Sequence, residues 1–290
     1  MPAAVSVPAR LDREHAVQRG SAKRSAWGAL GAPHSAALCA LLLGLAALAW
    51  IALFSWSASP YSRYLAHGGW NDLALLAALC RAIPEGSIVV PAVLHALAWV
   101  LMIGAMMLPT TYPLVALFRR IVAGRPDARG MVGRVLGGFF VAWFAFGIVA
   151  HVLDEALQWG ASRAPWLVTH GWVVGAAVLA TAGAFQFSAL KYRCLEECHT
   201  PFSFIMQRWQ GRAPSREAWR LGLDHGLFCI GCCWALMLIM FVVGTGNLGW
   251  MLVLAAVMAA EKNLSWGRRL RTPLGLGLIA WSAGIVALHA

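Results

Sequence analysis

Charge is what this sequence has least of. Only 12% of its 290 residues are Asp, Glu, Lys or Arg, whereas a soluble domain of this size carries about 25%. Hydrophobic residues make up 60% of the chain, and the mean hydropathy is +0.67. Apolar runs recur along the chain, and a helix crosses a bilayer in about 20 residues. The composition excludes an ordinary soluble fold and predicts an integral membrane protein.

Other signatures are missing as well. The chain has no nucleotide-binding glycine loop, no heptad array and no repeat of fixed period. Its apolar runs are continuous, whereas the strands of a membrane barrel show short alternating segments. We therefore predict an all-α fold, a polytopic transmembrane helical bundle. About seven spans are expected, at residues 36–56, 92–118, 133–153, 166–190, 226–244, 247–262 and 273–289.

Residues 1–35 are polar and basic, and we expect a basic cytoplasmic tail ahead of a transmembrane helical domain of residues 36–290. The first apolar run is longer than the 7–15 residues of a cleaved signal, so we expect it to be retained. In the connection 191–225, aromatic residues alternate with arginines. This pattern is typical of helices lying on the membrane surface, and we expect such helices at 202–210 and 214–223.

The formal net charge of +11 would suggest nucleic acid as the partner of a soluble protein. Here the basic residues lie in short loops. Of the 23 Lys and Arg residues, all but Arg63, Arg81 and Arg163 fall in the tail and the loops after the second, fourth and sixth spans. By the positive-inside rule, the N-terminus is expected in the cytoplasm. We predict a multi-pass protein of the bacterial inner membrane. Its expected partner is the lipid bilayer, and nucleic acid is not expected as a partner.

Cysteines are crowded into one region. Five of the seven lie within residues 194–233, which is not the pattern of a secreted disulfide framework. In "HGLFCIGCCW" (225–234), the histidine and three cysteines share one helical face. "KYRCLEECHTP" (191–201) adds two cysteines spaced i, i+4, at the same membrane side by the predicted topology. The predicted metal site consists of Cys194, Cys198, His225, Cys229, Cys232 and Cys233.

Thiolate and imidazole ligands suit zinc, and thiolates also suit Cu(I) or an iron–sulfur cluster. We favour copper, with zinc as the alternative metal. A second interpretation is redox chemistry, because Cys229 and Cys232 form a C-x-x-C pair, and such pairs exchange disulfides. The chain would then be a membrane thiol-disulfide or metal-dependent oxidoreductase. A third is helix packing through small side chains. Whether the protein is an enzyme stays open.

A second constellation is expected near the outer ends of three spans. Ionisable side chains at membrane depth are costly and often functional. Such side chains could form a second metal site or a proton relay. The alternative is that they mark the solvent-exposed end of a helix. These residues are His95, His151, Asp154, Glu155 and His170.

Four segments resemble a bacterial family of predicted metal-binding integral membrane proteins. They are "AWVLMIGAMMLPTTYPL" (98–114), "LKYRCLEECHTP" (190–201), "LDHGLFCIGCCWALMLIMFVVGTGNLGWM" (223–251) and "EK" (261–262). The resemblance covers about residues 93–265. It implies a polytopic helical fold and a metal role for the six inner residues, but no reaction. Together with the cysteine pattern, it leads us to expect copper binding, transfer or delivery to a membrane or periplasmic protein partner.

Overall fold

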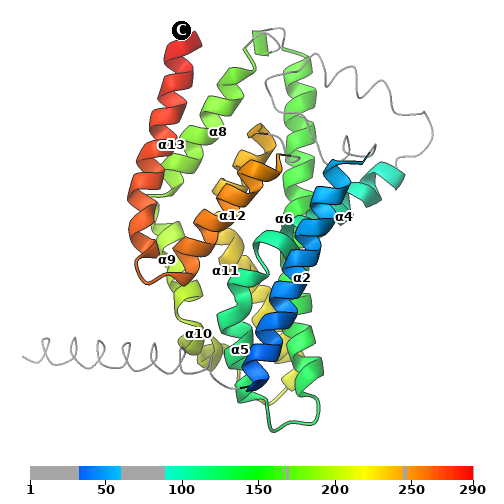
Figure 1. The fold of residues 1–290 in the computed structure, drawn as a ribbon. Coiled ribbons are helices and arrows are strands. Elements are labelled where there is room, and N and C mark those ends of the chain that lie inside the picture. The colour runs from blue at the N-terminus through cyan, green and yellow to red at the C-terminus, as the bar shows by residue number, and fades with distance from the viewer. Residues whose placement is uncertain (1–32, 60–88, 165, 168–169, 244–246, 290) are drawn as a thin grey trace, which may run out of the picture.

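The computed structural model describes residues 33–59, 89–164, 166–167, 170–243 and 247–289. Within these residues the regular structure is entirely helical, as predicted (Figure 1). Residues 1–32 of the predicted tail and residues 60–88, between the first two predicted spans, lie outside the described residues. The elements are α2 (Pro33–Ser57), α4 (Val89–Met106), η3 (Pro109–Thr111), α5 (Tyr112–Ile121), α6 (Ala128–Ser162), α8 (Trp172–Phe185), α9 (Ala189–His199), α10 (Pro201–Arg208), α11 (Pro214–Val243), α12 (Leu248–Asn263) and α13 (Gly267–His289).

Several helices are long and apolar enough to cross a membrane. Four of the described helices meet this condition alone, namely α2, α6, α11 and α13, and the number rises to six if each of two bent helix pairs is one span. The predicted span at 247–262 corresponds to α12, which has 16 residues. At about 1.5 Å per residue, α12 falls short of the roughly 30 Å hydrocarbon core. The count of seven spans and the cytoplasmic N-terminus stay predictions.

Two of the predicted spans are broken. The second bends by 47° between Met106 and Pro109, where Pro109 and Pro113 interrupt the helical hydrogen bonding. The fourth bends by 61° between α8 and α9, and no proline marks this place. A new helix begins there because the Ser188 hydroxyl caps α9, accepting a hydrogen bond from the backbone N–H of Lys191. Cys194 and Cys198 of the predicted metal site therefore lie on a separate helix, α9.

The fifth predicted span is longer than expected. We expected residues 214–223 to form a separate surface-lying helix, but they continue into α11 without interruption, so that prediction is wrong. No proline occurs between Pro214 and the end of α11 to separate the two parts. The start of α11 is fixed by Glu217, whose carboxylate accepts hydrogen bonds from the backbone N–H groups of residues 210–213.

α11 lies along α6 through most of its length (Figure 1). Glycines allow this approach: a Cβ atom at Gly222 would collide with the backbone carbonyl of Val135, and one at Gly226 with the Cβ of Ala142. Small residues at such crossings let the backbones of membrane helices come close. α11 is thereby held at the centre of the bundle, in contact with α6, α8, α9 and α12.

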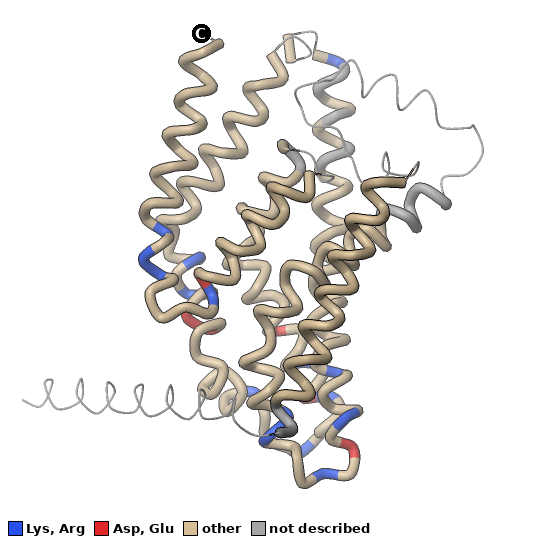
Figure 2. The backbone as a smooth tube through the Cα atoms, viewed as in Figure 1, with Lys and Arg blue, Asp and Glu red and all other residues tan. Residues whose placement is uncertain are grey.

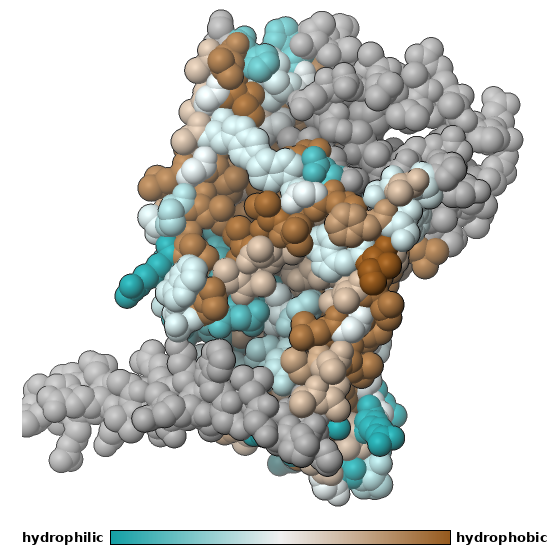
Figure 3. Space-filling model, viewed as in Figure 1, coloured by the Kyte–Doolittle hydropathy of each residue, from teal (hydrophilic) through white to brown (hydrophobic). Residues whose placement is uncertain are grey.

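Polar and apolar surfaces are separated along the bundle. Lys and Arg residues lie mainly in the lower half of the view, with one further basic position at the far end of α6 (Figure 2), where Arg163 follows the helix. Large apolar side chains cover the flanks between (Figure 3), and examples such as Leu48, Ile51, Val152 and Leu153 are exposed. Exposed apolar area on this scale marks a surface that contacts something other than water.

Substituting Gly222 tests the close α6–α11 contact. Gly222→Ala should lower the free energy of unfolding in detergent by about 1–3 kcal/mol, because the added methyl overpacks the interface. Gly133→Ala on α6 is the matched control, since a Cβ there meets no atom within 4 Å. The control should be neutral or stabilise by up to about 1 kcal/mol through helix propensity. Equal unfolding curves for the two variants would contradict the packing described.

Candidate metal centre

The cysteines predicted to meet do meet. Cys194 and Cys198 lie one turn apart on α9, which packs against α11. The Cys194 thiol lies directly beside Gly231, where any side chain would displace it. The Cys198 thiol lies near those of Cys232 and Cys233, close enough for electrostatic interaction. Both predicted cysteine motifs therefore contribute to one group of thiols, between helices that are separated in the sequence by α10.

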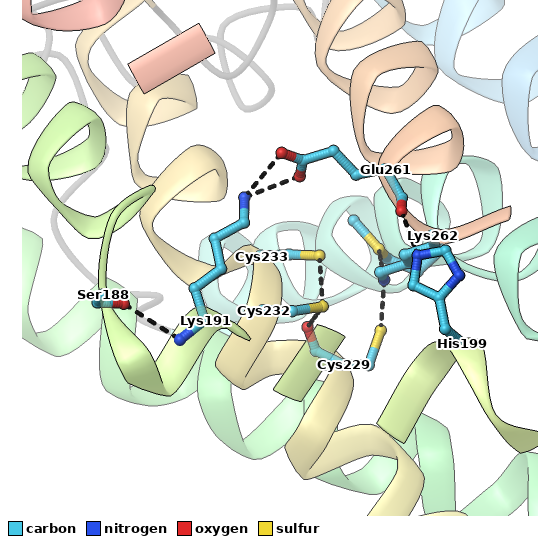
Figure 4. Close-up of polar contacts among 9 residues, drawn as sticks. Ser188, Lys191, His199, Cys229, Cys232, Cys233, Glu261 and Lys262 are labelled. Carbon is cyan, nitrogen blue, oxygen red and sulfur yellow. Dashed lines mark hydrogen bonds and ion pairs between the residues drawn. The ribbon is translucent and has the colours of Figure 1, made fainter. Parts of the chain in front are cut away.

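A group of neighbouring sulfur atoms results from this packing. The Sγ atoms of Cys232 and Cys233 are 3.3 Å apart and hydrogen-bonded, and Cys229 lies near Cys233, close enough for electrostatic interaction. The Cys232 thiol also donates to the Cys229 carbonyl oxygen, at 3.1 Å. Figure 4 shows the three α11 cysteines side by side. We call the five residues Cys194, Cys198, Cys229, Cys232 and Cys233 the thiol cluster.

The thiol cluster is part of the protein interior. Four of its members are buried, and only Cys198 is half-buried. They pack in one core with methionines from α4, α11 and α12, including Met106, Met237 and Met240. Methionine is a common filler of such cores. The cysteines therefore stand in surroundings from which water is excluded.

Lys262 contacts the thiol cluster, although it was not among the predicted site residues. Its ammonium donates a hydrogen bond to Cys229 Sγ at 2.8 Å and contacts Met107 Sδ at 3.6 Å. Figure 4 shows the Lys262 side chain beside the α11 sulfurs. In the sequence, Lys262 ends an apolar segment, and we counted it as a topology residue. Its place in the "EK" pair, one of the segments shared with the resembling family, was the available signal.

A buried ion pair fixes the position of Lys262. The Lys191 ammonium on α9 donates to both carboxylate oxygens of Glu261 on α12, at 3.0 and 2.8 Å, and both side chains are almost fully buried. His199 adds a second tie, with its Nε2 at 2.7 Å from the Glu261 carbonyl oxygen. These contacts hold the end of α12 against α9, so that the next residue, Lys262, reaches the thiols (Figure 4).

His225 stands apart from the thiol cluster. It lies one turn before Cys229 on α11, as predicted, but its buried ring stacks on Phe139, with centroids 5.7 Å apart, and meets Phe204 edge-on. Its Nδ1 atom has no hydrogen-bond partner. The imidazole is therefore held by aromatic packing, and no hydrogen bond of the described residues joins it to a thiol.

The donor set suits a soft ion. Thiolates and thioethers select Cu(I) over hard cations, and five thiols and the Met107 thioether gather here. Nevertheless, in the described part of the chain no group of three or more His, Cys, Asp or Glu residues is arranged as a metal-binding set. Instead, the thiols of Cys232 and Cys233 form a hydrogen bond with each other, and Cys229 Sγ accepts one from Lys262. Binding one ion would require these thiols to turn from these hydrogen bonds.

The predicted outer constellation lies mostly beyond what the structure describes. The side chains of His95, Asp154 and Glu155 are outside the described set, although their backbones are helical. His151 is half-buried on α6. The His170 ring stacks on Trp166 at 4.6 Å, and its Nδ1 lies 2.9 Å from the Trp166 carbonyl oxygen. The second metal or proton site stays a prediction.

Comparison with known proteins gives one family. The family model PpoB2, described as a copper chaperone, matches residues 96–285, about two thirds of the chain. The match includes all five members of the thiol cluster, Lys262 and the Lys191–Glu261 pair. No curated protein and no solved structure matches the chain.

Removing one partner of the buried ion pair should destabilise the protein strongly. We expect Glu261→Gln to lower the free energy of unfolding by about 3–5 kcal/mol, because the Lys191 ammonium is left buried and unpaired. The surface pair Arg134–Asp127, whose side chains are 40% and 57% exposed, provides the control. Asp127→Asn should cost no more than about 1 kcal/mol. Chemical unfolding in detergent measures both, and similar losses would contradict the account.

Proposed function

This chain belongs to the PpoB2 copper-chaperone family, and from that premise we propose that it is an integral membrane protein that binds copper at the thiol cluster and passes it to another protein. Copper is the cargo in this proposal. The proposed ligands are drawn from Cys194, Cys198, Cys229, Cys232 and Cys233, with His225 one helical turn away. The cluster faces the cytoplasmic half of the membrane, in keeping with the asymmetry of Lys and Arg along the sequence.

The observation that carries the proposal is the meeting of five thiols from two helices. Cys198 on α9 lies near Cys232 on α11, and Cys232 and Cys233 are hydrogen-bonded neighbours in the same group of sulfur atoms. Neighbouring thiols that shift their mutual hydrogen bonds can present sulfur to an ion by rotation about one or two side-chain bonds. Thiolate is the ligand that Cu(I) favours, and an apolar surrounding protects Cu(I) from water. A chaperone needs both features.

The length and composition of the helices support the proposed membrane location. α2, α6, α11 and α13 are long and apolar enough to cross a bilayer, and apolar side chains are exposed along α2 and α6. We propose the bacterial inner membrane as the location, and a membrane or periplasmic protein as the partner that receives copper. The outer residues His95, His151 and His170 remain the proposed second site.

Copper retention tests the function directly. Purified protein should be loaded with Cu(I) under reducing conditions and passed through gel filtration in detergent. The wild type should retain copper, whereas the Cys229→Ser/Cys232→Ser/Cys233→Ser variant should lose it, because hydroxyls are poor ligands for Cu(I). Cys39→Ser, which removes a thiol on α2 outside the cluster, should behave as wild type. Equal copper in all three proteins would end the proposal.

Thiol alkylation separates copper binding from the oxidoreductase alternative. The 3.3 Å contact of Cys232 and Cys233 makes redox chemistry the competing explanation, since close thiols exchange disulfides. We expect Cu(I) to protect the cluster from a maleimide polymer, and a Cu(I) chelator to restore labelling fully. A redox pair would behave differently: oxidant would protect it, and chelation would leave it protected until a reductant was added. Gel mobility reports each outcome.

A further inference from the structure

Lys262 carries a buried positive charge, and no ion pair joins it to a carboxylate within the described residues. The residue is 5% exposed, and its ammonium contacts two sulfur atoms, Cys229 Sγ and Met107 Sδ. The other buried lysine, Lys191, forms an ion pair with Glu261, so those two charges cancel. One positive charge is left over, and it lies against the thiol cluster.

An ammonium buried in apolar surroundings needs an anion. Its transfer out of water costs several kcal/mol unless a partner compensates it, and at membrane depth such groups usually have a functional partner. The atoms in direct contact with the ammonium are Cys229 Sγ and Met107 Sδ, and the neighbouring Glu261 carboxylate is already paired with Lys191. An anion that balances Lys262 at contact distance would therefore form on sulfur, which is where copper would bind.

The charge of a copper complex matches this requirement. Cu(I) carries one positive charge, and each thiol that becomes a ligand gives its proton to solvent and brings one negative charge. Two thiolates on one Cu(I) ion leave a net charge of minus one, which the Lys262 ammonium cancels. A divalent ion on the same two thiolates is already neutral, so the ammonium would remain buried without compensation.

We propose that Lys262 is a specificity-determining residue whose ammonium is the built-in counter-cation of a two-thiolate copper(I) complex and disfavours divalent ions at the same thiols. This proposal rests on the copper function proposed above and names what makes the site selective. The neutral Lys191–Glu261 pair holds the end of α12 and contributes no net charge. The selectivity therefore depends on one side chain.

The test compares the affinities for two ions. Cu(I) affinity is measured by competition with a chromophoric Cu(I) chelator, and Zn(II) affinity by competition with a chromophoric Zn(II) chelator. Lys262→Met keeps the length and apolar stem of the side chain and removes the charge. Lys262→Arg keeps the charge. Arg269→Met removes an exposed positive charge from the same region of the chain and serves as the control.

We expect Lys262→Met to lower the ratio of Cu(I) to Zn(II) affinity by at least about tenfold. Without the ammonium, the negative charge of the two-thiolate Cu(I) complex is buried and unpaired, whereas the zinc complex is neutral. Lys262→Arg should restore the ratio to near the wild-type value, and Arg269→Met should leave it unchanged. A purely structural role for Lys262 would instead lower both affinities together. Gel filtration in detergent checks folding, and Lys262→Gln replaces the Met variant if that variant aggregates.

Two results would overturn the proposal while leaving the copper function intact. One is an unchanged affinity ratio in Lys262→Met or Lys262→Gln. The other is an equal loss of the ratio in the Arg and Met variants, which would assign the effect to shape rather than charge. The copper function itself fails if wild type and the triple serine variant retain the same copper, and that measurement does not involve Lys262.

Discussion

The Lys191–Glu261 ion pair is the contact on which the arrangement of the site depends. It joins α9 to the end of α12 in the protein interior, where only excellent geometry offsets the cost of desolvating both charges. Because Glu261 is held, its neighbour Lys262 reaches Cys229, and because Lys191 is held, α9 keeps its cysteines against α11. Both sides of the thiol cluster are thus aligned by one pair of charges, supported by His199.

Much of this arrangement could be predicted from periodicity and composition. Apolar runs predicted the helices, and the shared helical face of Cys229, Cys232 and Cys233 predicted their alignment. The bend at Pro109 is of the kind that proline causes. The bend before α9 could not be predicted in the same way, because it depends on a serine cap and on packing rather than on a proline. Lys262 was missed for a related reason. A lysine at the end of an apolar run is typical of a loop, and only tertiary contacts bring it among the thiols.

The site also combines two roles that sequence patterns treat as alternatives. Cysteines that bind metal and cysteines that fill a core were weighed against each other, yet the thiol cluster packs in the same core as Met106, Met237 and Met240. The aromatic packing of His225 between Phe139 and Phe204 belongs to this pattern too. In an interior of this kind, the residues proposed to bind an ion also determine how tightly the helices around them pack.

The unequal burial of the thiols has a kinetic meaning. Cys198 is half-buried and the other four are buried, so in the proposed copper transfer a thiol of the partner protein would reach Cys198 before any other member. Copper that moves from sulfur to sulfur would then bind in a fixed order, with Cys198 as the first ligand on entry and the last on release. The four buried thiols would lengthen the time for which an ion stays bound, without blocking its access through Cys198.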